Sequence, residues 1–514
     1  MKKFKALVSI LIALATAAAL TACSGAANET TTGSAGSTGA STGRKESNSV
    51  VVGIQAFDGL DPHNATSAGT REVLYNVYEG LVRITSTGDL EAAVASEYTV
   101  ADDASSILFT IRDGIEFWDG TPVTAQDIIF SIERYADIQN VSAFSIVESI
   151  EAVGDDQVRI DLSKPSSEFI YNLNNVCAII PASYDEKTEE YPQGTGPFKY
   201  VSYEEGVDLV VEKNENYWKE NCPYLDKVTF RLVPDADIAV QQLNSGSLDI
   251  YQYLSADQCN ELDKSMFNVV AGSVNMVQAL YLNNAVEPFD DPLVRQAIYY
   301  AIDRDEINDF LFEGQAHIIG TNMIPAMSKY YDESLEDFYT LDTDKARELL
   351  AQAGYENGFT FTIQVPSIYP LHVSTAEIIK ADLEKIGVNA EIQKIEWETW
   401  LSDVYSNRQY EATVVAVDGK AAPNSWFAKN VSTASNNFTN YSNEKFDEIY
   451  EQAMDAIDLD KKAELYRQLQ KMLAEDAASI YIQDPANLVA VNADLEGYTF
   501  YPVSAQDVTV IRYK

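Results

Sequence analysis

The sequence is poor in histidine, cysteine and basic side chains. Of its 514 residues, three are histidine and four are cysteine, and Lys and Arg together number 36 against 79 Asp and Glu. The histidines His63, His317 and His372 stand singly, and no H-E-x-x-H, Walker or dinucleotide-binding glycine pattern occurs. A formal charge of −43 repels nucleic acid and anionic lipid. We therefore expect no metal centre, no cofactor and no nucleic-acid partner.

A run apolar enough to cross a bilayer is also missing. The longest apolar stretch, Ala6 to Leu20, is shorter than the roughly 20 residues that a spanning helix needs. It follows the basic start Met1-Lys2-Lys3-Phe4-Lys5 and ends at small residues before Cys23. This order is the layout of a secretory signal, which we assign to residues 1–23.

The segment Leu20-Thr21-Ala22-Cys23 resembles the lipobox of bacterial lipoproteins. The resemblance implies that Cys23 becomes the acylated first residue of the mature protein and holds it on the extracytoplasmic face of the cell membrane. Because the acidic surface repels anionic lipid, we expect attachment through the lipid and not through a basic face. The alternative is an ordinary secreted protein whose mature chain begins near a cysteine.

Residues 24–49 predict a flexible tether. They are almost all Ser, Thr, Gly, Ala and Asn, which cannot bury an apolar face. A coil of this length reaches roughly 25–30 Å. The stretch Gly39-Ala40-Ser41-Thr42-Gly43 matches the G-x-S-x-G hydrolase pattern, but no strand precedes it and no helix follows. We interpret that match as a consequence of composition.

Three cysteines follow Cys23, namely Cys177, Cys222 and Cys259. Because three is an odd number, at most one disulfide can form among them, and their spacing fits no zinc pattern. We expect them to be buried or free, and a single disulfide stays open as the alternative.

The rest of the chain, from about residue 50, alternates strand and helix patterns. Val50-Val51-Val52-Gly53-Ile54 is typical of a buried strand, and residues 70–81 predict a helix. Thr124 and Asp127 form a capping-box pattern that opens a helix to about residue 135. Asp291 before Pro292, and Asp303 before Glu306, mark two further helix starts. This alternation predicts mixed α/β sheets.

Three blocks of this body resemble one family. They are ASEYTVADDASSILFTIRDGIEFWDGTPVTAQDIIFSIER (Ala95 to Arg134), Gly194-Thr195-Gly196-Pro197-Phe198, and Asn283 followed by Pro288 to Arg304. In content and order they are similar to the oligopeptide/dipeptide/nickel class of extracellular solute-binding proteins that serve ABC transporters. Most of these residues are turn and cap residues, so they indicate the fold and few are expected to touch ligand.

The resemblance implies an α/β fold with two lobes joined by a hinge, the type II periplasmic-binding-protein-like architecture with an extra subdomain. The first lobe is then expected to hold residues 50–85, 192–284 and 488–514. The extra subdomain is expected over 86–191 and the second lobe over 285–487. The hinge strands are expected near Leu280–Asn284 and Ala486–Val491, and function would depend on closure of the lobes over ligand.

Many members of the family anchor the α-amino group of a peptide with an aspartate, in a loop that resembles Gly-Trp-x-x-Asp before a proline. When Pro423 is aligned with that proline, Gly419 occupies the aspartate position, Asp418 lies one residue away, and Lys420 adds a positive charge. We take Asp418 as the candidate anchor. The departure from the pattern makes a non-peptide solute more plausible, and a simply solvated Asp418 stays open as well.

Aromatic side chains give large contact areas at low entropic cost and are common in pockets. Besides Asp418, the ligand-binding candidates are Trp426, Trp397, Tyr369, His372 and Asn283. Trp426 lies in a polar loop, whereas Trp400 is expected in the core. We do not expect His372 to bind metal, because lone histidines are usually structural.

The sequence shows no nucleophile with a base, no paired acids and no metal cluster, so nothing in it indicates catalysis. The resemblance implies a monomeric, lipid-anchored receptor. Such a receptor would bind a peptide or peptide-like solute and deliver it to the permease subunits of an ABC transporter. Three alternatives stay open: a peptide-pheromone sensor, a surface hydrolase on the same scaffold, or a receptor for a non-peptide solute.

Overall fold

The computed structural model describes residues 48–65, 67–184, 192–419 and 421–514. The predicted signal segment, Cys23 and the tether up to residue 47 lie outside the described residues. Among the residues that are described, no helix combines the length and the apolar character needed to cross a membrane.

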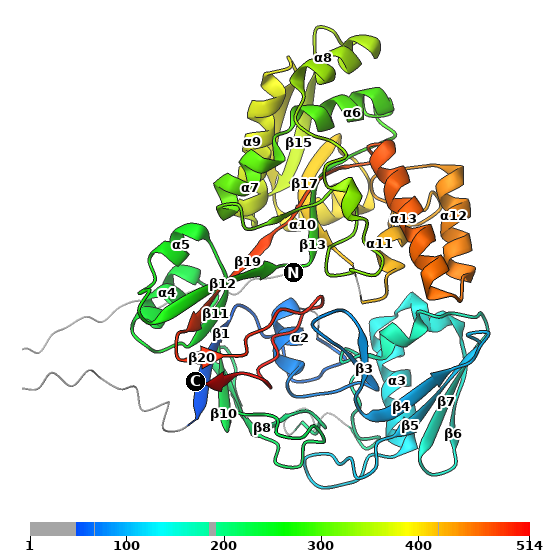
Figure 1. Cartoon of the computed structure of the whole chain (residues 1–514), viewed down its shortest axis with the longest axis vertical. Helices are drawn as coiled ribbons and strands as arrows, with labels where there is room; N and C mark the ends of the chain where they lie inside the picture. The colour runs from blue at the N-terminus through cyan, green and yellow to red at the C-terminus, as the bar shows by residue number, and fades with distance from the viewer. Residues whose placement is uncertain (1–47, 66, 185–191, 420) are drawn as a thin grey trace, which may run out of the picture. The chain divides into compact units, whose positions relative to one another are not determined.

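The first large sheet is mixed, with β1 near its centre (Figure 1). β1 runs parallel to both of its neighbours, β10 and β11, and the outer pairs are antiparallel. In spatial order its described strands are β12 (Phe267–Ser273), β19 (Ala486–Asn492), β11 (Ile250–Leu254), β1 (Ser49–Ile54), β10 (Lys227–Leu232), β9 (Asp208–Lys213) and β8 (Phe198–Glu204). We call the part of the molecule built on this sheet the first lobe.

The second large sheet is also mixed. β13 lies antiparallel between β17 and β18, and β15 runs parallel to β16 and β17. In spatial order its described strands are β14 (His317–Ile318), β18 (Ile480–Asp484), β13 (Met276–Leu282), β17 (Ala412–Asp418), β15 (Thr360–Pro366) and β16 (Asn389–Ile395). We call the part built on this sheet the second lobe.

A third, antiparallel sheet forms a subdomain with helix α3 (Ala125–Gln139). Its described strands, in order, are β4 (Ala95–Val100), β5 (Ser106–Ile111), β7 (Gln157–Leu162) and β6 (Val147–Val153). Two small antiparallel sheets pair β2 (Val82–Ile84) with β3 (Leu90–Ala92), and β20 (Leu495–Glu496) with β21 (Arg512–Tyr513). The three larger sheets confirm the predicted α/β class.

The helices cover the sheets. Those of the first lobe are α2 (Ala68–Leu74), α4 (Ala236–Asn244) and α5 (Ala256–Asn260). Those of the second lobe are α6 (Pro292–Ala301), α7 (Arg304–Phe312), α8 (Thr343–Gln352), α9 (Pro370–Glu384), α10 (Trp397–Thr399), α11 (Ser425–Ala428), α12 (Glu444–Asp455) and α13 (Leu459–Glu475), with a π-helical turn η4 over Trp400–Ser406. Short 3₁₀ segments are η1 (Ser142–Ile146), η2 (Phe169–Leu173) and η3 (Glu333–Leu335).

The predicted helix starts are confirmed. Thr124 and Asp127 form the full capping box of α3, and Asp291 and Asp303 cap α6 and α7. The helix predicted over 70–81 is wrong in length, because α2 ends at residue 74. The Asn76 side chain donates to the carbonyls of Val73 and Glu72, at 3.2 and 3.3 Å. Such side-chain bonds compete with continuation of the helix.

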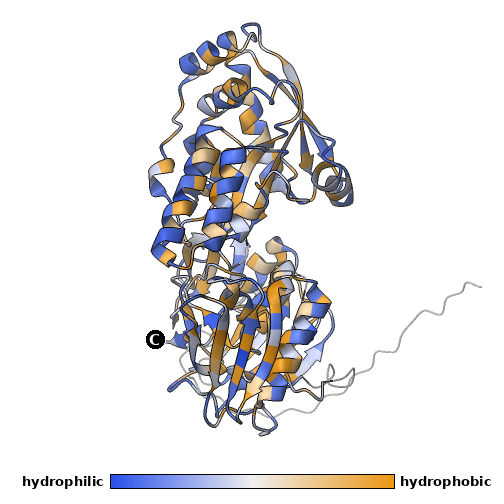
Figure 2. Cartoon of the chain, turned by 90° about the vertical axis from the view of Figure 1, so that its right-hand side faces the viewer, coloured by the Kyte–Doolittle hydropathy of each residue, from blue (hydrophilic) through white to orange (hydrophobic). Residues whose placement is uncertain are grey.

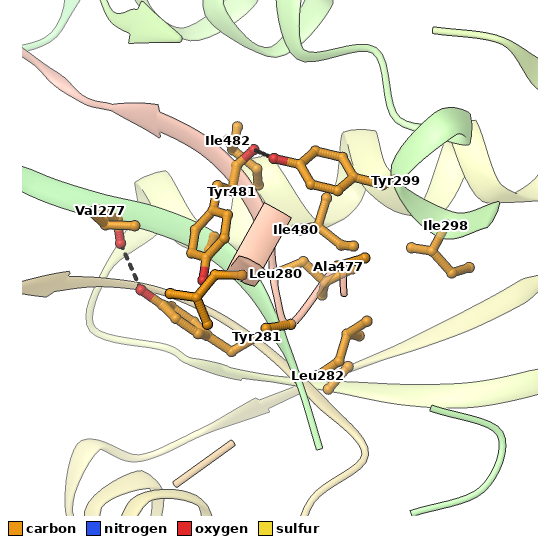
Figure 3. Packing of buried hydrophobic residues seen from close by; sticks show 14 of the residues in the cluster. Val277, Leu280, Tyr281, Leu282, Ile298, Tyr299, Ala477, Ile480, Tyr481 and Ile482 are labelled. Carbon is orange, nitrogen blue, oxygen red and sulfur yellow. Dashed lines mark hydrogen bonds between the residues drawn. The ribbon is translucent and has the colours of Figure 1, made fainter. Parts of the chain in front are cut away.

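Helices and strands both show hydrophilic and hydrophobic residues along their length (Figure 2). In the second lobe, β13 and β18 pack against α6 (Figure 3). Two buried tyrosines there satisfy their hydroxyls on backbone carbonyls: Tyr281 donates to Val277 at 3.0 Å and Tyr299 to Tyr481 at 2.8 Å. In the described part of the chain, Cys177, Cys222 and Cys259 are all free, and the first and last are buried.

The two large sheets are joined where β12 leads into β13 and where β18 leads into β19. At this crossing the Val274 N–H donates to the Pro485 carbonyl (2.9 Å), and the Met276 N–H donates to the Asp484 carboxylate (3.1 Å). The chain therefore passes from one sheet to the other at residues 274–275 and at residue 485. Of the segments expected at the hinge, Leu280 to Leu282 lie inside β13, buried and paired with neighbouring strands, and Ala486–Val491 lies in β19. Movement of the lobes about these strands stays a prediction.

The residue ranges expected for the two lobes do not coincide with the limits of the two sheets. The range 192–284 includes β13, which belongs to the second sheet, and β19 begins in the first sheet at residue 486. The sequence shows continuous strands here and gives no sign of the point at which the chain changes sheet. The exact domain limits stay a prediction.

Candidate ligand-binding site

A cavity of about 230 Å³ is lined by segments from both lobes and from the subdomain. The first lobe contributes α2 and the residue after it, and the subdomain contributes α3 and residues 171–176. The second lobe contributes the loop that follows β17, residues 418–422 without the undescribed residue 420. This volume is below the roughly 300–1,000 Å³ typical of pockets for drug-sized ligands, so the cavity suits a small solute.

Two charged side chains are found among the described residues that line the cavity. Arg71, partly buried, projects from α2 of the first lobe, and Asp418, exposed, stands at the end of β17 in the second lobe. Each lobe therefore supplies one charge, and the two charges have opposite signs. This arrangement fits a solute that carries an anionic and a cationic group, because each group would find a complementary partner.

Side-chain amides from the subdomain line the cavity beside these charges. The Asn174 amide is used within its own turn: it donates to the Tyr171 carbonyl at 2.6 Å and accepts from the Val176 N–H at 3.1 Å. Asn175 is different. Its Nδ2 donates to the Tyr78 carbonyl at 3.0 Å, whereas its buried Oδ1 has no hydrogen-bond partner in the described part of the chain.

The orientation of the Asn175 amide follows from chemistry. The Tyr78 carbonyl can only accept a hydrogen bond, so the NH₂ group of Asn175 must face it and Oδ1 must face the other way. A buried acceptor left without a donor costs roughly 1–3 kcal/mol. An N–H group of a bound solute would remove that cost.

The Trp426 indole packs against the loop that carries Asp418. A Cβ atom on Gly419 would lie 2.1 Å from Cε2 of the Trp426 indole, so only glycine fits at this position. Trp426 is 1 % exposed and is not among the residues that line the cavity. The indole therefore excludes an aspartate at position 419, and Asp418 is the acidic residue that reaches the cavity.

Lys429 supports the same loop. Its Nζ donates to the Asp418 carbonyl at 3.5 Å and lies 5.9 Å from the centre of the Trp426 ring. Burial lowers the pKa of Lys429 to about 8, and the nearby Asp418 carboxylate opposes that shift.

His372, Tyr369 and Trp397 form an aromatic group beside β17 and are not among the residues that line the cavity. The Trp397 ring stacks on Trp400 at 4.9 Å and meets Tyr369 edge-on at 5.5 Å. His372 Nε2 accepts the Ala416 N–H at 3.2 Å, and its Nδ1 lies 2.9 Å from the Gln278 amide nitrogen. Burial lowers the pKa of His372 to about 4, so the imidazole is neutral near pH 7.

Asn283 lies at the other end of β13. Its Nδ2 donates to the carbonyls of Arg408 and Tyr410, at 3.1 and 2.9 Å, and its Oδ1 accepts from Asn440 at 2.8 Å. All of these partners belong to the second lobe. The side chain holds two loops together there and is not among the residues that line the cavity.

Of the six predicted binding residues, the structure thus places Asp418 on the cavity. Trp426 packs against the loop that lines the cavity, the Tyr369–His372–Trp397 group contacts β17, and Asn283 is remote; none of these is among the lining residues. Contact of any of them with a solute stays a prediction. Arg71 and Asn175 line the cavity but were not predicted, because neither lies in a recognisable motif.

A profile of the bacterial extracellular solute-binding proteins, family 5 (middle domain), matches residues 89–439. The glutathione-binding protein GsiB of Escherichia coli (strain K12) is 27% identical over 477 residues, which is 88% of this chain and 92% of GsiB.

Two solved structures extend these similarities. The binding protein AgaA of A. tumefaciens R10, in complex with agropinic acid, shares 26% identity with a TM-score of 0.73 over 91% of this chain and 99% of AgaA. A dipeptide-binding protein of Pseudoalteromonas sp. SM9913, in complex with Met-Leu, shares 25% identity with a TM-score of 0.73 over 91% of this chain and all (100%) of that protein.

Proposed function

The chain belongs to the bacterial extracellular solute-binding proteins of family 5, and on this premise we propose that it captures a short peptide-like zwitterion between its lobes for an ABC transporter. The resemblance to this family and the two-lobed α/β fold, both expected from the sequence, are confirmed. Its relatives are binding proteins, so we assign the chain a binding role without chemistry on the solute.

The observation that carries the proposal is the pair of opposite charges on the cavity, with Arg71 from the first lobe and Asp418 from the second. In the proposed complex the Asp418 carboxylate faces the ammonium group of the solute and the Arg71 guanidinium faces its carboxylate. Asn175 Oδ1 accepts an N–H of the solute, such as that of an amide bond. Because the two charges belong to different lobes, a zwitterion binds both of them only when the lobes are closed.

A non-peptide solute is the second candidate. It is favoured by Gly419, which occupies the position where many family members carry the amine-binding aspartate, and by the agropinic acid bound to AgaA. The two candidates differ in whether the solute needs a free amine.

We further propose that the receptor is a monomer, anchored through an acylated Cys23 on the extracytoplasmic face of the membrane, and that it passes its solute to permease subunits. The lipobox resemblance and the tether composition support this placement. Replacement Cys23→Ser should move the protein from the membrane pellet to the soluble fraction, and persistence in the pellet would refute the anchor.

The direct test is native mass spectrometry of the freshly purified protein, which should reveal a retained solute by its mass. Thermal melting then compares alanyl-alanine with its N-acetylated form. A solute that binds only the native state stabilises it by roughly 2.7 kcal/mol at a hundredfold excess over Kd. A higher melting temperature with the free dipeptide alone supports the peptide receptor. Equal shifts with both forms favour the second candidate, and a chemically altered solute would refute the binding role.

A further inference from the structure

A buried ion pair joins the subdomain to the second lobe. Glu168 directly precedes η2 in the subdomain, and Lys462 and Tyr466 lie on α13 of the second lobe. Lys462 Nζ lies 3.9 Å from a Glu168 carboxylate oxygen, and the Tyr466 hydroxyl lies 2.9 Å from both oxygens and donates to the carboxylate. We call these three residues the Glu168 cluster.

The cluster is isolated from water. The Glu168 and Lys462 side chains are 4% and 1% exposed, and Tyr466 is fully buried. Burial raises the pKa of Glu168 and lowers that of Lys462, and in each case the charge of the partner opposes the shift. Each charge is thus unfavourable here alone and is tolerated because the other is present.

Two polar contacts beside the cluster are less buried. The Ser167 hydroxyl donates to the Ala456 carbonyl at 3.4 Å, and Lys164 lies 3.7 Å from an Asp455 carboxylate oxygen. Both side chains of the Lys164–Asp455 pair are more than half exposed, and pairs of this kind contribute little. The Glu168 cluster is therefore more deeply buried than the polar contacts beside it.

The same segments build the cavity. η2 begins directly after Glu168 and carries Tyr171 and Asn172, which line the cavity, as does Asn175 shortly after it. The backbone N–H of Asn424 also bonds the Glu168 carboxylate, and Asn424 follows the lining residues Ala421 and Ala422. The cluster thus holds the two segments that meet around the solute.

We propose that the Glu168 cluster is a closure latch, which sets the fraction of molecules in the closed state and through it the apparent affinity, without touching the solute. The expected effect on apparent affinity rests on the proposed receptor function, whereas the expected effect on the closed fraction does not. When the lobes separate, both charges return to water. When the lobes close, a charge without its partner would be buried at a cost, so either residue alone opposes closure. Apparent affinity falls in proportion to the closed, binding-competent fraction.

The test uses variants that remove one charge while keeping shape. Glu168→Gln keeps an acceptor for Tyr466, and Lys462→Met keeps the length of the side chain. The double variant removes both charges. The matched control is Lys461→Met, the neighbouring position on α13, whose exposed ion pair with Glu464 leaves both side chains more than half in water.

The first readout is small-angle X-ray scattering of the ligand-free protein, which needs no knowledge of the solute. Each single variant should show a larger radius of gyration than the wild type, whereas the double variant and Lys461→Met should match the wild type. Identical curves for the wild type and both single variants would overturn the latch, whether or not any peptide binds.

The second readout is the Kd for alanyl-alanine by calorimetry. Each single variant should bind about tenfold more weakly or worse, and the double variant should recover most of the loss, so that the cycle is strongly non-additive. Additive losses would show that each residue contributes to packing alone and would overturn the latch. Absence of dipeptide binding in the wild type would count against the proposed function and would leave the scattering result to decide the latch.

Discussion

The two walls of the cavity are built in different ways. The wall from the first lobe and the subdomain is broad and combines apolar side chains with Arg71, several tyrosines and several side-chain amides. The wall from the second lobe is a single loop that presents one carboxylate, Asp418, over the indole of Trp426. A broad wall can recognise the shape and hydrogen-bonding groups of a solute. The narrow wall can close on that solute and add the negative charge of Asp418.

A different buried titratable group is associated with each wall. Glu72 lies on α2 behind the first wall and accepts from the Tyr253 hydroxyl and the Gln252 amide. His372 contacts β17, the strand that leads into the second wall, and accepts from the Ala416 N–H. Burial disfavours the charged form of both groups, so the two walls are sensitive to opposite ends of the pH scale.

The largest expected effect concerns Glu72. Burial raises its pKa to about 7 from 4.5, so its contribution to stability is full below about pH 4.5 and is lost as the pH rises through 7. The loss amounts to about 3 kcal/mol. Glu72→Gln should remove this fall when the free energy of unfolding is measured by denaturant titration at several pH values. The exposed Glu133→Gln is the control, and an unchanged slope in Glu72→Gln would contradict the assignment.

An effect of similar size and opposite direction is expected at His372. Its pKa of about 4 lies below the ordinary 6.5, so its contribution is full above about pH 6.5 and is lost as the pH falls through 4. This loss is again about 3 kcal/mol. His372→Gln should flatten the acid side of the same titration. An acid side as steep in His372→Gln as in the wild type would show that burial of His372 has no consequence for stability.

A smaller effect is expected at the charge of the second wall. Asp418→Ala should weaken binding of a dipeptide with a free amine by tenfold or more, which corresponds to about 1.4 kcal/mol or more for a charge-assisted contact. Calorimetry with the N-acetylated dipeptide supplies the control, because this ligand has no ammonium group to lose. An unchanged Kd for the free dipeptide would remove Asp418 from the site.

The smallest effect is expected on the first wall. Asn175→Leu should weaken dipeptide binding several-fold, about 1 kcal/mol, because one neutral hydrogen bond is lost. A dipeptide methylated on its amide nitrogen lacks the N–H and should bind wild type and variant equally. If the variant binds both ligands as the wild type does, recognition of the solute N–H by the first wall is disproved.

Local patterns allowed much of the fold to be predicted. The Thr124–Asp127 capping box and the Asp291 and Asp303 caps depend on residues a few positions apart, and all three are confirmed. The helix over 70–81 was overestimated because the side chain of Asn76 terminates α2, an effect that hydrophobic periodicity does not register. The point at which the chain changes sheet was not predictable, because a strand pattern does not reveal which sheet the strand joins.

The candidate site was predictable in part. Asp418 could be found because its loop resembles a family pattern, although that pattern has its aspartate at the position of Gly419. Arg71 and Asn175 could not be found, since they meet Asp418 only after the chain has crossed from the first lobe to the second. The Glu168–Tyr466 contact spans 298 positions and has no local signal at either end.

By itself the sequence determined the α/β class, the family, the helix starts and the acidic surface. These features depend on neighbouring residues or on composition, which are present before the chain folds. The tertiary structure alone decided which charges share a cavity, why residue 419 must be glycine, and which buried acid meets which buried base. Those outcomes depend on distances between residues remote in sequence, and only packing of the lobes and the subdomain sets such distances.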